Sequence, residues 1–531
     1  MSALPILAAA PAGAVESSSA RRRDLLRFIT CGSVDDGKST LIGRLLHDSG
    51  HLFEDQLEAL ARDSARMGTQ GGALDLALAL DGLAAEREQG ITIDVAYRYF
   101  STARRSFIVA DTPGHEEYTR NMATGASTAD AAILLVDVRK GVTTQTRRHA
   151  VLVAMLGIRH VALAVNKMDL AGFAREPYEA VMVEARRLAD ALGLGLTGVP
   201  IAALTGDNVA ARSAAMPWHQ GPHLLEWLET LAVGEEETGS LRLAVQSVSR
   251  PDSSFRGYAG LVTGGPAWPG QAVTVYPSGK ATRIARIVTY DGDLDLALPG
   301  QSVTLTLADE VDVSRGCVIA AGPAPAVTGR VSARLFWMAP EPLRPGASYL
   351  AKIGTQLVPA TVTAIAGRIA LEPLGEEPAA ALGPNDVGDV ALVFDRPVVV
   401  EPYRDSRDLG GLILIERESF ATVALGLVQK AAAGPGESEE REAAPAPREA
   451  AAWLAVPFAA PWRSILKTVT WRLLGTFLTV LVAYALTRNL RLALVLGGIE
   501  ILAKFVLYFG HERLWARIGL GLRALPSASG R

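Results

Sequence analysis

Length, composition and charge exclude several classes of protein. The chain has 531 residues, enough for three or four domains. Its 52 basic and 56 acidic residues give a net charge of −4, which argues against bulk nucleic acid as the main partner. Two cysteines, Cys31 and Cys317, allow neither a disulfide framework nor a cysteine-rich metal site, so a reducing interior is expected.

The first 23 residues precede the first predicted element. Residues 1–20 are small and apolar, but arginines follow this stretch at positions 21–23. A secretory signal has the opposite order, with the positive charges first. We therefore expect a disordered leader over 1–23 and no cleaved signal peptide.

A glycine-rich loop follows the apolar run from Leu26 to Thr30. It has the pattern G-x-x-x-x-G-K-S and leads into a helix predicted over Thr40 to Leu46. Such a loop brings free backbone amides around phosphate oxygens, and its glycines permit close approach. Lys38 is expected to reach the β- and γ-phosphates, and Ser39 to bind Mg²⁺. The predicted phosphate-binding residues are Gly32, Ser33, Val34, Asp35, Asp36, Gly37, Lys38, Ser39 and Thr40.

Two further motifs are predicted to hold the metal and to sense the γ-phosphate. Asp111 ends the apolar run Ser106 to Ala110, where P-loop proteins place a carboxylate on the metal side. Thr92 can close over the ion, and the Gly114 amide can contact the γ-phosphate, so loss of that phosphate would release both. The predicted metal ligands are Ser39, Thr92 and Asp111. One of the two motifs contains Thr92, and the other consists of Asp111, Thr112, Pro113, Gly114 and His115.

His115 follows directly after Asp-Thr-Pro-Gly, where a side chain that orients the attacking water is needed. We predict it as the hydrolytic residue. The alternative is an ordinary surface histidine.

The nucleotide base is predicted from the motif Asn166, Lys167, Met168 and Asp169, which follows the apolar run His160 to Val165. A carboxylate only accepts hydrogen bonds, so Asp169 can pair with the N1 and 2-amino donors of guanine. Adenine lacks both donors, and an unpaired buried carboxylate is costly. The sequence therefore predicts GTP and not ATP. A weaker fifth motif is Ala202, Ala203 and Leu204, in which the amides of Ala203 and Leu204 are expected to face the guanine.

The predicted fold class is an α/β P-loop GTPase domain followed by two β-barrel domains and a C-terminal α-helical hairpin. The expected domains are a GTP-binding P-loop domain over 24–235 with a parallel sheet, and barrels over 236–325 and 326–430. A flexible linker is expected over 431–455 and the hairpin over 456–525. A helical stretch is predicted from His51 to Ala85. Predicted barrel strands are Leu241–Ser249, Gly257–Gly264, Gln271–Tyr276, Ala281–Tyr290, Gln301–Leu307, Val331–Trp337, Ser348–Ile353, Gln356–Ile365, Val387–Phe394 and Gly411–Glu416.

The order of a P-loop domain and two barrels resembles the elongation factor Tu class of translational GTPases. Within that class, several segments are similar to the large GTPase subunit of bacterial sulfate adenylyltransferases. They are C-G-S-V-D-D-G-K-S-T at 31–40, D-G-L at 81–83 with E-R-E-Q-G-I-T-I-D at 86–94, Y-T-R-N-M-A-T-G-A-S at 118–127, G-D-N at 206–208, R-P-D at 250–252 and F-R-G at 255–257.

The resemblance implies a smaller catalytic partner subunit that forms adenosine 5′-phosphosulfate and pyrophosphate from ATP and sulfate, an uphill reaction coupled to GTP hydrolysis. Coupling requires the partner to bind the GTP and GDP forms with different affinity. Ile91, Thr92, His115 and Tyr118 are the candidate interface. One alternative is a translation-factor-like GTPase that delivers an aminoacylated RNA. Another is a membrane scaffold whose GTPase only gates assembly.

The C-terminus departs from relatives that carry a fused adenylylsulfate kinase, because no second G-x-x-x-x-G-K-[ST] follows residue 39. Residues 462–518 instead resemble a small predicted bacterial membrane domain with two apolar runs, Leu473–Leu486 and Leu492–Phe509, flanked by aromatic and basic residues. The first run rises about 21 Å, short of a hydrocarbon core of about 30 Å. The alternatives are a hairpin that spans, lies on the membrane, stays soluble or packs on a second copy. We expect a cytoplasmic GTPase core tethered to the inner membrane.

Overall fold

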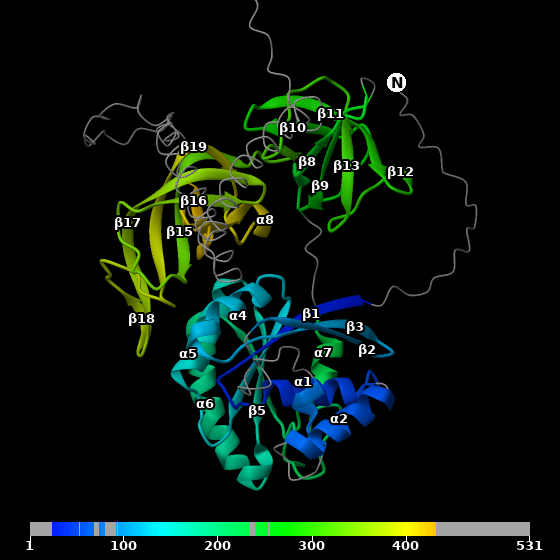
Figure 1. Cartoon of the computed structure of the whole chain (residues 1–531), viewed down its shortest axis with the longest axis vertical. Coiled ribbons are helices and arrows are strands. Elements are labelled where there is room, and N and C mark those ends of the chain that lie inside the picture. Colours follow the sequence, from blue (N-terminus) through cyan, green and yellow to red (C-terminus); the bar gives the residue numbers. More distant parts are fainter. Residues whose placement is uncertain are drawn as a thin grey trace, which may run out of the picture. The chain divides into compact units, whose positions relative to one another are not determined.

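The computed structural model describes residues 24–52, 54–67, 74–79, 92, 94–232, 239–252 and 255–431. They form one α/β domain and two β-barrels, as predicted (Figure 1). The predicted leader, the predicted linker beyond Ala431 and the predicted hairpin lie outside these residues. The exact domain boundaries stay predictions.

The α/β domain is built on a six-stranded sheet in the order β2-β3-β1-β4-β5-β6. The sheet is mixed and not parallel throughout, which corrects the prediction: β2 runs antiparallel to β3, and the other neighbours are parallel. The reason is the short turn between β2 and β3, since such a turn produces a hairpin, whereas parallel strands need a long crossover. The strands are β1 (Asp24–Cys31), β2 (Ala96–Ser101), β3 (Arg105–Asp111), β4 (Ala131–Asp137), β5 (His160–Asn166) and β6 (Gly195–Pro200).

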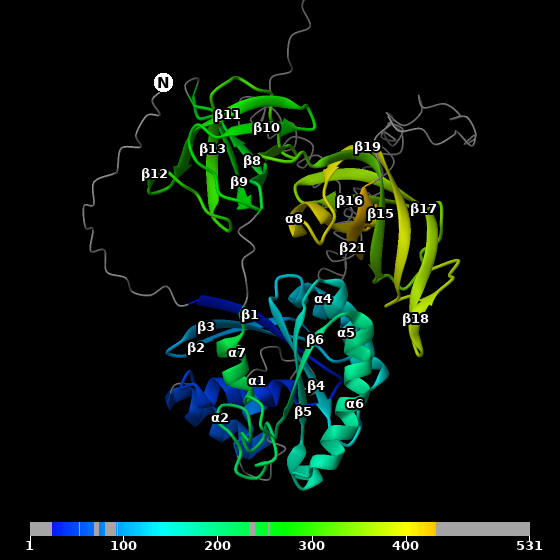
Figure 2. The ribbon, with the colours of Figure 1, turned by 180° about the vertical axis from the view of Figure 1, so that it is seen from behind.

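Helices cover both faces of this sheet, as the two opposite views show (Figures 1 and 2). One core packs α4, α5 and α6 against residues such as Ile29, and the other packs α1 and α7 against residues such as Phe28. This alternation follows from the period of two along a strand. The helices are α1 (Lys38–Asp48), α2 (Glu54–Met67), α4 (Thr119–Ala126), α5 (Thr144–Met155), α6 (Arg175–Leu192) and α7 (Leu224–Thr230), with 3₁₀ turns η1 (Leu76–Ala79), η2 (Glu116–Tyr118) and η3 (Met168–Ala171).

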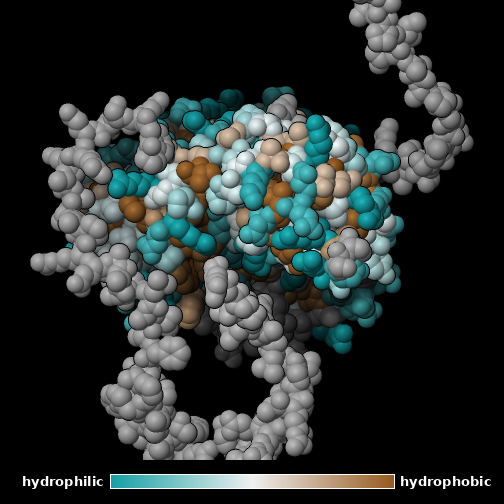
Figure 3. Space-filling view, turned by 90° about the horizontal axis from the view of Figure 1, so that it is seen from above, coloured by the Kyte–Doolittle hydropathy of each residue, from teal (hydrophilic) through white to brown (hydrophobic). Residues whose placement is uncertain are grey.

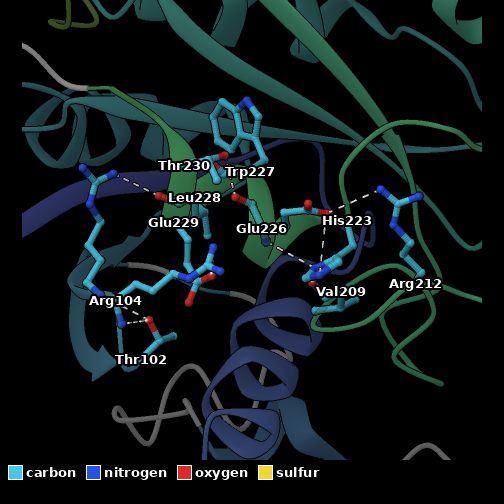
Figure 4. A network of polar contacts seen from close by, with 11 residues as sticks. Thr102, Arg104, Val209, Arg212, His223, Glu226, Trp227, Leu228, Glu229 and Thr230 are labelled. Carbon is cyan, nitrogen blue, oxygen red and sulfur yellow. Dashed lines mark hydrogen bonds and ion pairs between the residues drawn. The ribbon is translucent and has the colours of Figure 1, made fainter.

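Helix α7 is fixed at both ends by polar contacts (Figure 4). At its start, His223 Nδ1 accepts a hydrogen bond from the Glu226 amide (3.2 Å), and Arg212 lies 3.8 Å from the Glu226 carboxylate. Near its end, Glu229 pairs with Arg104 of the β2–β3 turn (3.6 Å). Helix α7 therefore ties the β2–β3 hairpin to the sheet face opposite α5.

The first barrel closes because β10 pairs with β11 as well as with β14. The predicted strand Leu241–Ser249 is two strands: both pair with β9, but the register shifts by one residue between the pair Leu243–Val262 and the pair Ser247–Ala259. Strands β12 and β14 were not predicted. The strands are β7 (Arg242–Ala244), β8 (Ser247–Ser249), β9 (Gly257–Thr263), β10 (Ala272–Tyr276), β11 (Lys280–Thr289), β12 (Gly292–Leu294), β13 (Ser302–Leu307) and β14 (Val318–Ala320).

The second barrel closes through β16, which pairs with both β17 and β20. Strand β17 runs past the predicted end at Ile365, and β18 and β21 were not predicted as strands. The elements are β15 (Ala326–Trp337), β16 (Ser348–Ile353), β17 (Gln356–Leu371), β18 (Leu374–Glu377), β19 (Val387–Val400), the short helix α8 (Arg407–Gly410), β20 (Gly411–Ile415) and β21 (Thr422–Ala431).

The surface in Figure 3 mixes hydrophilic and hydrophobic side chains, with the hydrophobic ones in separate patches. Among the helices in the described part of the chain, none combines the length and the apolar character that crossing a bilayer requires.

Candidate nucleotide-binding site

The phosphate loop joins the end of β1 to the start of α1 and is held by its own side chains. Asp36 Oδ2 accepts a hydrogen bond from the Ser33 amide (2.7 Å). The Lys38 ammonium donates to the carbonyls of Gly32 (3.1 Å) and Ser33 (2.8 Å). Gly37 has a φ of 93°, and a Cβ on it would lie 2.5 Å from the Asn166 side chain. Only glycine therefore fits at this position.

Two charges are buried in this loop. Burial lowers the pKa of Lys38, although the nearby Asp111 and Asp36 carboxylates oppose that shift. Burial raises the pKa of Asp36 to about 6, although Lys38 opposes the shift. A desolvated ammonium surrounded by backbone carbonyls is suited to an anionic ligand, because the negative charge of the ligand compensates the positive charge that water no longer solvates.

The three predicted metal ligands lie together. Ser39 Oγ on α1 is 3.4 Å from Asp111 Oδ2 at the end of β3 and 3.5 Å from Thr92 Oγ1. Thr30 on β1 donates to the other Asp111 oxygen (3.5 Å). Hydroxyl and carboxylate oxygens are the ligands that Mg²⁺ prefers, so this set fits a magnesium ion.

The motif of residues 111–115, which we call the switch, packs on the phosphate loop through Gly114. A Cβ on Gly114 would lie 2.4 Å from Lys38 Nζ and 2.8 Å from the Gly32 carbonyl, so the two backbones are in contact. His115 is exposed, and its Nδ1 accepts a hydrogen bond from the Glu117 amide (3.3 Å) at the start of η2. The structure thus places His115 next to the loop while its ring caps a local turn, and its hydrolytic role stays a prediction.

Asn166 connects the base motif to the phosphate loop. Its Nδ2 donates to the Asp36 carbonyl (2.7 Å), and its Oδ1 accepts from the Ala203 amide (3.0 Å). The Ala203 amide, which we expected to face guanine, is therefore engaged with Asn166. Asp169 lies partly exposed in η3, two residues after the left-handed Lys167 (φ 63°). Guanine recognition by Asp169 and Leu204 stays a prediction.

Sequence reasoning missed Asp137, which ends β4 beside Asn166 of β5. Its buried carboxylate accepts from Arg139 Nη2 (2.7 Å) and lies 3.1 Å from Lys167 Nζ. Burial by itself raises the pKa of Asp137, but the hydrogen bonds from Arg139 and Lys167 outweigh it and leave the pKa below its usual value. The available signal was its position, because a carboxylate at the end of an apolar parallel strand lies at the binding edge of the sheet.

These features define a P-loop GTPase domain followed by two barrels. Residues 23–242 match the family "elongation factor Tu GTP binding domain", and residues 330–429 match "GTP-eEF1A C-terminal domain-like". Residues 465–516 match the family "predicted membrane protein (DUF2061)".

Curated relatives identify the family more closely. Sulfate adenylyltransferase subunit 1 of Methylorubrum extorquens (strain PA1) is 58% identical over 416 residues, which are 78% of this chain and 89% of the relative. The proteins of the same name from Laribacter hongkongensis (51% identity; 80% and 89% covered) and Aeromonas hydrophila (52%; 77% and 86%) are also similar. The chain belongs to the sulfate adenylyltransferase subunit 1 family. The predicted resemblance is confirmed.

Replacing Asp137 tests whether it positions the base motif. Asp137→Ala releases Lys167 and Arg139, and hydrogen bonds between charged groups contribute about 1.5–3 kcal/mol. We expect GTP affinity to fall about ten- to hundredfold in an equilibrium titration. Asp190→Ala, an exposed change on α6, is the control. Equal affinities for Asp137→Ala and wild type would contradict this role.

Proposed function

We propose that this chain is the GTP-hydrolysing subunit of a sulfate adenylyltransferase, in which GTP hydrolysis drives synthesis of adenosine 5′-phosphosulfate from ATP and sulfate. The 58% identity to a protein named sulfate adenylyltransferase subunit 1 carries this proposal. The buried lysine in a glycine-framed loop supports the GTP half of it.

In this proposal the phosphate loop, residues 32–40, holds the triphosphate. Lys38 turns from the loop carbonyls to the β- and γ-phosphates. Ser39, Thr92 and Asp111 hold Mg²⁺, which neutralises charge on the phosphate oxygens when bound. Residues 111–115 contact the γ-phosphate side, and residues 166–169 with 202–204 frame the guanine.

The proposed partner is a small catalytic subunit that adenylylates sulfate. A ligand shifts a two-state equilibrium only by its differential affinity, so the partner has to distinguish the GTP and GDP arrangements of the switch. Thr92, His115 and Tyr118, the described members of the predicted interface, are proposed to make that contact. The alternative, delivery of an aminoacylated RNA, is not favoured by the family or by the net charge of −4.

We also propose that the C-terminal region attaches the GTPase core to the inner membrane from the cytoplasmic side. The match of residues 465–516 to a family of predicted membrane proteins supports this.

Co-expression with the small subunit tests the whole proposal. We expect GTP to accelerate adenosine 5′-phosphosulfate formation, measured together with GTP turnover. A chain without residues 453–531 should keep this stimulation but leave the membrane fraction. Normal GTP turnover without any effect on adenylylation would favour a scaffold, and co-purified tRNA would favour the RNA carrier.

Asp169→Asn tests the assignment of the base. An amide donor suits the 2-oxo group of xanthine, so the variant should prefer xanthosine triphosphate over GTP. Competition binding with both nucleotides measures this preference. Unchanged selectivity for GTP would remove Asp169 from the pocket.

His115→Ala tests the hydrolytic role. We expect nearly unchanged GTP affinity and single-turnover hydrolysis slowed about a hundredfold, the lower end of general acid–base contributions. His160→Ala, at the exposed start of β5, is the control. Hydrolysis at the wild-type rate would assign His115 to the surface alternative.

A further inference from the structure

One buried histidine, on helix α5, contacts the first residue of the phosphate loop. His149 lies on α5, fully buried, and its Nδ1 accepts a hydrogen bond from the Gly32 amide (3.0 Å). Gly32 is the first residue of the loop, with a φ of 153°. A Cβ on it would lie 2.7 Å from the Leu135 carbonyl, so β4 confines the loop backbone on that side. His149 is therefore the described partner that fixes the direction of the first loop peptide.

The contact requires a neutral imidazole. Nδ1 can accept only if it carries no proton, so the proton is on Nε2. Burial, together with the nearby Lys38 and Arg148 cations, lowers the pKa of His149 to about 3. The ring is consequently neutral throughout the physiological range.

The second ring nitrogen faces Gln145, whose side-chain amide lies 2.9 Å from Nε2. A protonated Nε2 needs the amide oxygen as its acceptor, but in the structure the amide nitrogen faces the ring and the oxygen faces Arg148. Arg148 Nη1 donates to the Gln145 amide oxygen, at 2.5 Å, and Arg148 Nη2 lies 3.0 Å from Glu116. The oxygen can face His149 or Arg148, but not both.

These contacts form a chain of polar groups within the α/β domain. It starts at Gly32 in the phosphate loop, passes through His149, Gln145 and Arg148 on α5, and ends at Glu116, one residue after His115. In the structure Arg148 holds Glu116 through Nη2 and the Gln145 oxygen through Nη1, so that oxygen faces Arg148. When Glu116 moves and draws Arg148 with it, the oxygen is released and can turn to His149.

We propose that His149 is a positioning residue that, by accepting from the Gly32 amide, holds the Gly32 peptide and with it the start of the phosphate loop in place, and that Gln145 and Arg148 couple this contact to Glu116, one residue after the 111–115 motif. The proposal rests on the proposed binding of GTP and adds how the switch affects nucleotide retention. Loss of the acceptor leaves the Gly32 peptide free to rotate, which weakens the phosphate contacts.

The test measures dissociation of a fluorescent GDP from the full chain, after wild-type affinity for guanine nucleotides is established. His149→Leu should release GDP about tenfold faster, the effect of one lost hydrogen bond. His149→Asn should restore near wild-type release, because its oxygen can occupy the Nδ1 position. Thermal unfolding of each variant checks that it is folded.

The proposed coupling through Arg148 predicts slower GDP release, opposite to the faster release expected of His149→Leu. Arg148→Met removes the competitor for the Gln145 oxygen, so GDP release should slow about twofold, and only when His149 is present. Arg147→Met, whose side chain pairs with Glu184 of α6, is the matched control and should change nothing.

Each result decides one point. Equal release from wild type, His149→Leu and His149→Asn would overturn the positioning role, as would fast release from both variants. Unchanged or faster release from Arg148→Met would overturn the coupling. Wild-type protein that binds no guanine nucleotide would instead refute the proposed function, before His149 is in question.

Discussion

The geometry of the site depends on the side chain of Asn166. Its amide nitrogen binds the Asp36 carbonyl and its oxygen binds the Ala203 amide, so the phosphate loop and the fifth motif share one anchor. Only a side chain with both a donor and an acceptor can satisfy two buried backbone groups of opposite kind. A carboxylate or a leucine at this position would leave at least one of them unpaired. Gly37 completes the arrangement because a Cβ there would displace Asn166.

The same construction repeats along the edge of the sheet. Apolar strands β3, β4 and β5 each end in one buried polar residue, Asp111, Asp137 or Asn166. Hydrophobic burial of the strands fixes these three ends to within hydrogen-bond distance of their partners. Each polar end is then satisfied locally, Asp137 by Arg139 and Lys167, and Asp111 by Thr30 and Ser39. The core therefore sets the positions, and the polar ends supply the chemistry.

Much of the α/β domain was predictable because its signals are local. The phosphate loop, the runs before Asp111 and Asn166, and helix α1 follow from short patterns, and all appear where they were expected. His149 was not predictable, because no motif surrounds it in the sequence and its partner Gly32 is 117 residues away. Asp137 lacked a motif of its own. Strand β14 was missed because it has three residues and its partners β7 and β10 are distant in the sequence, whereas β12 and β18 are short strands paired in hairpins with β11 and β17.

The antiparallel edge of the sheet constrains how Thr92 can move. Ala96 at the start of β2 pairs with Asp111 at the end of β3, so the chain leading back to Thr92 starts beside the metal-side carboxylate. Hydrogen-bonded strands slip only in whole registers, and a slip that keeps side chains on the same face covers two residues, or roughly 7 Å. A slip of β2 along β3 would therefore move Thr92 by a whole register. Its hydroxyl, 3.5 Å from Ser39 Oγ in this structure, would lose that contact in one step.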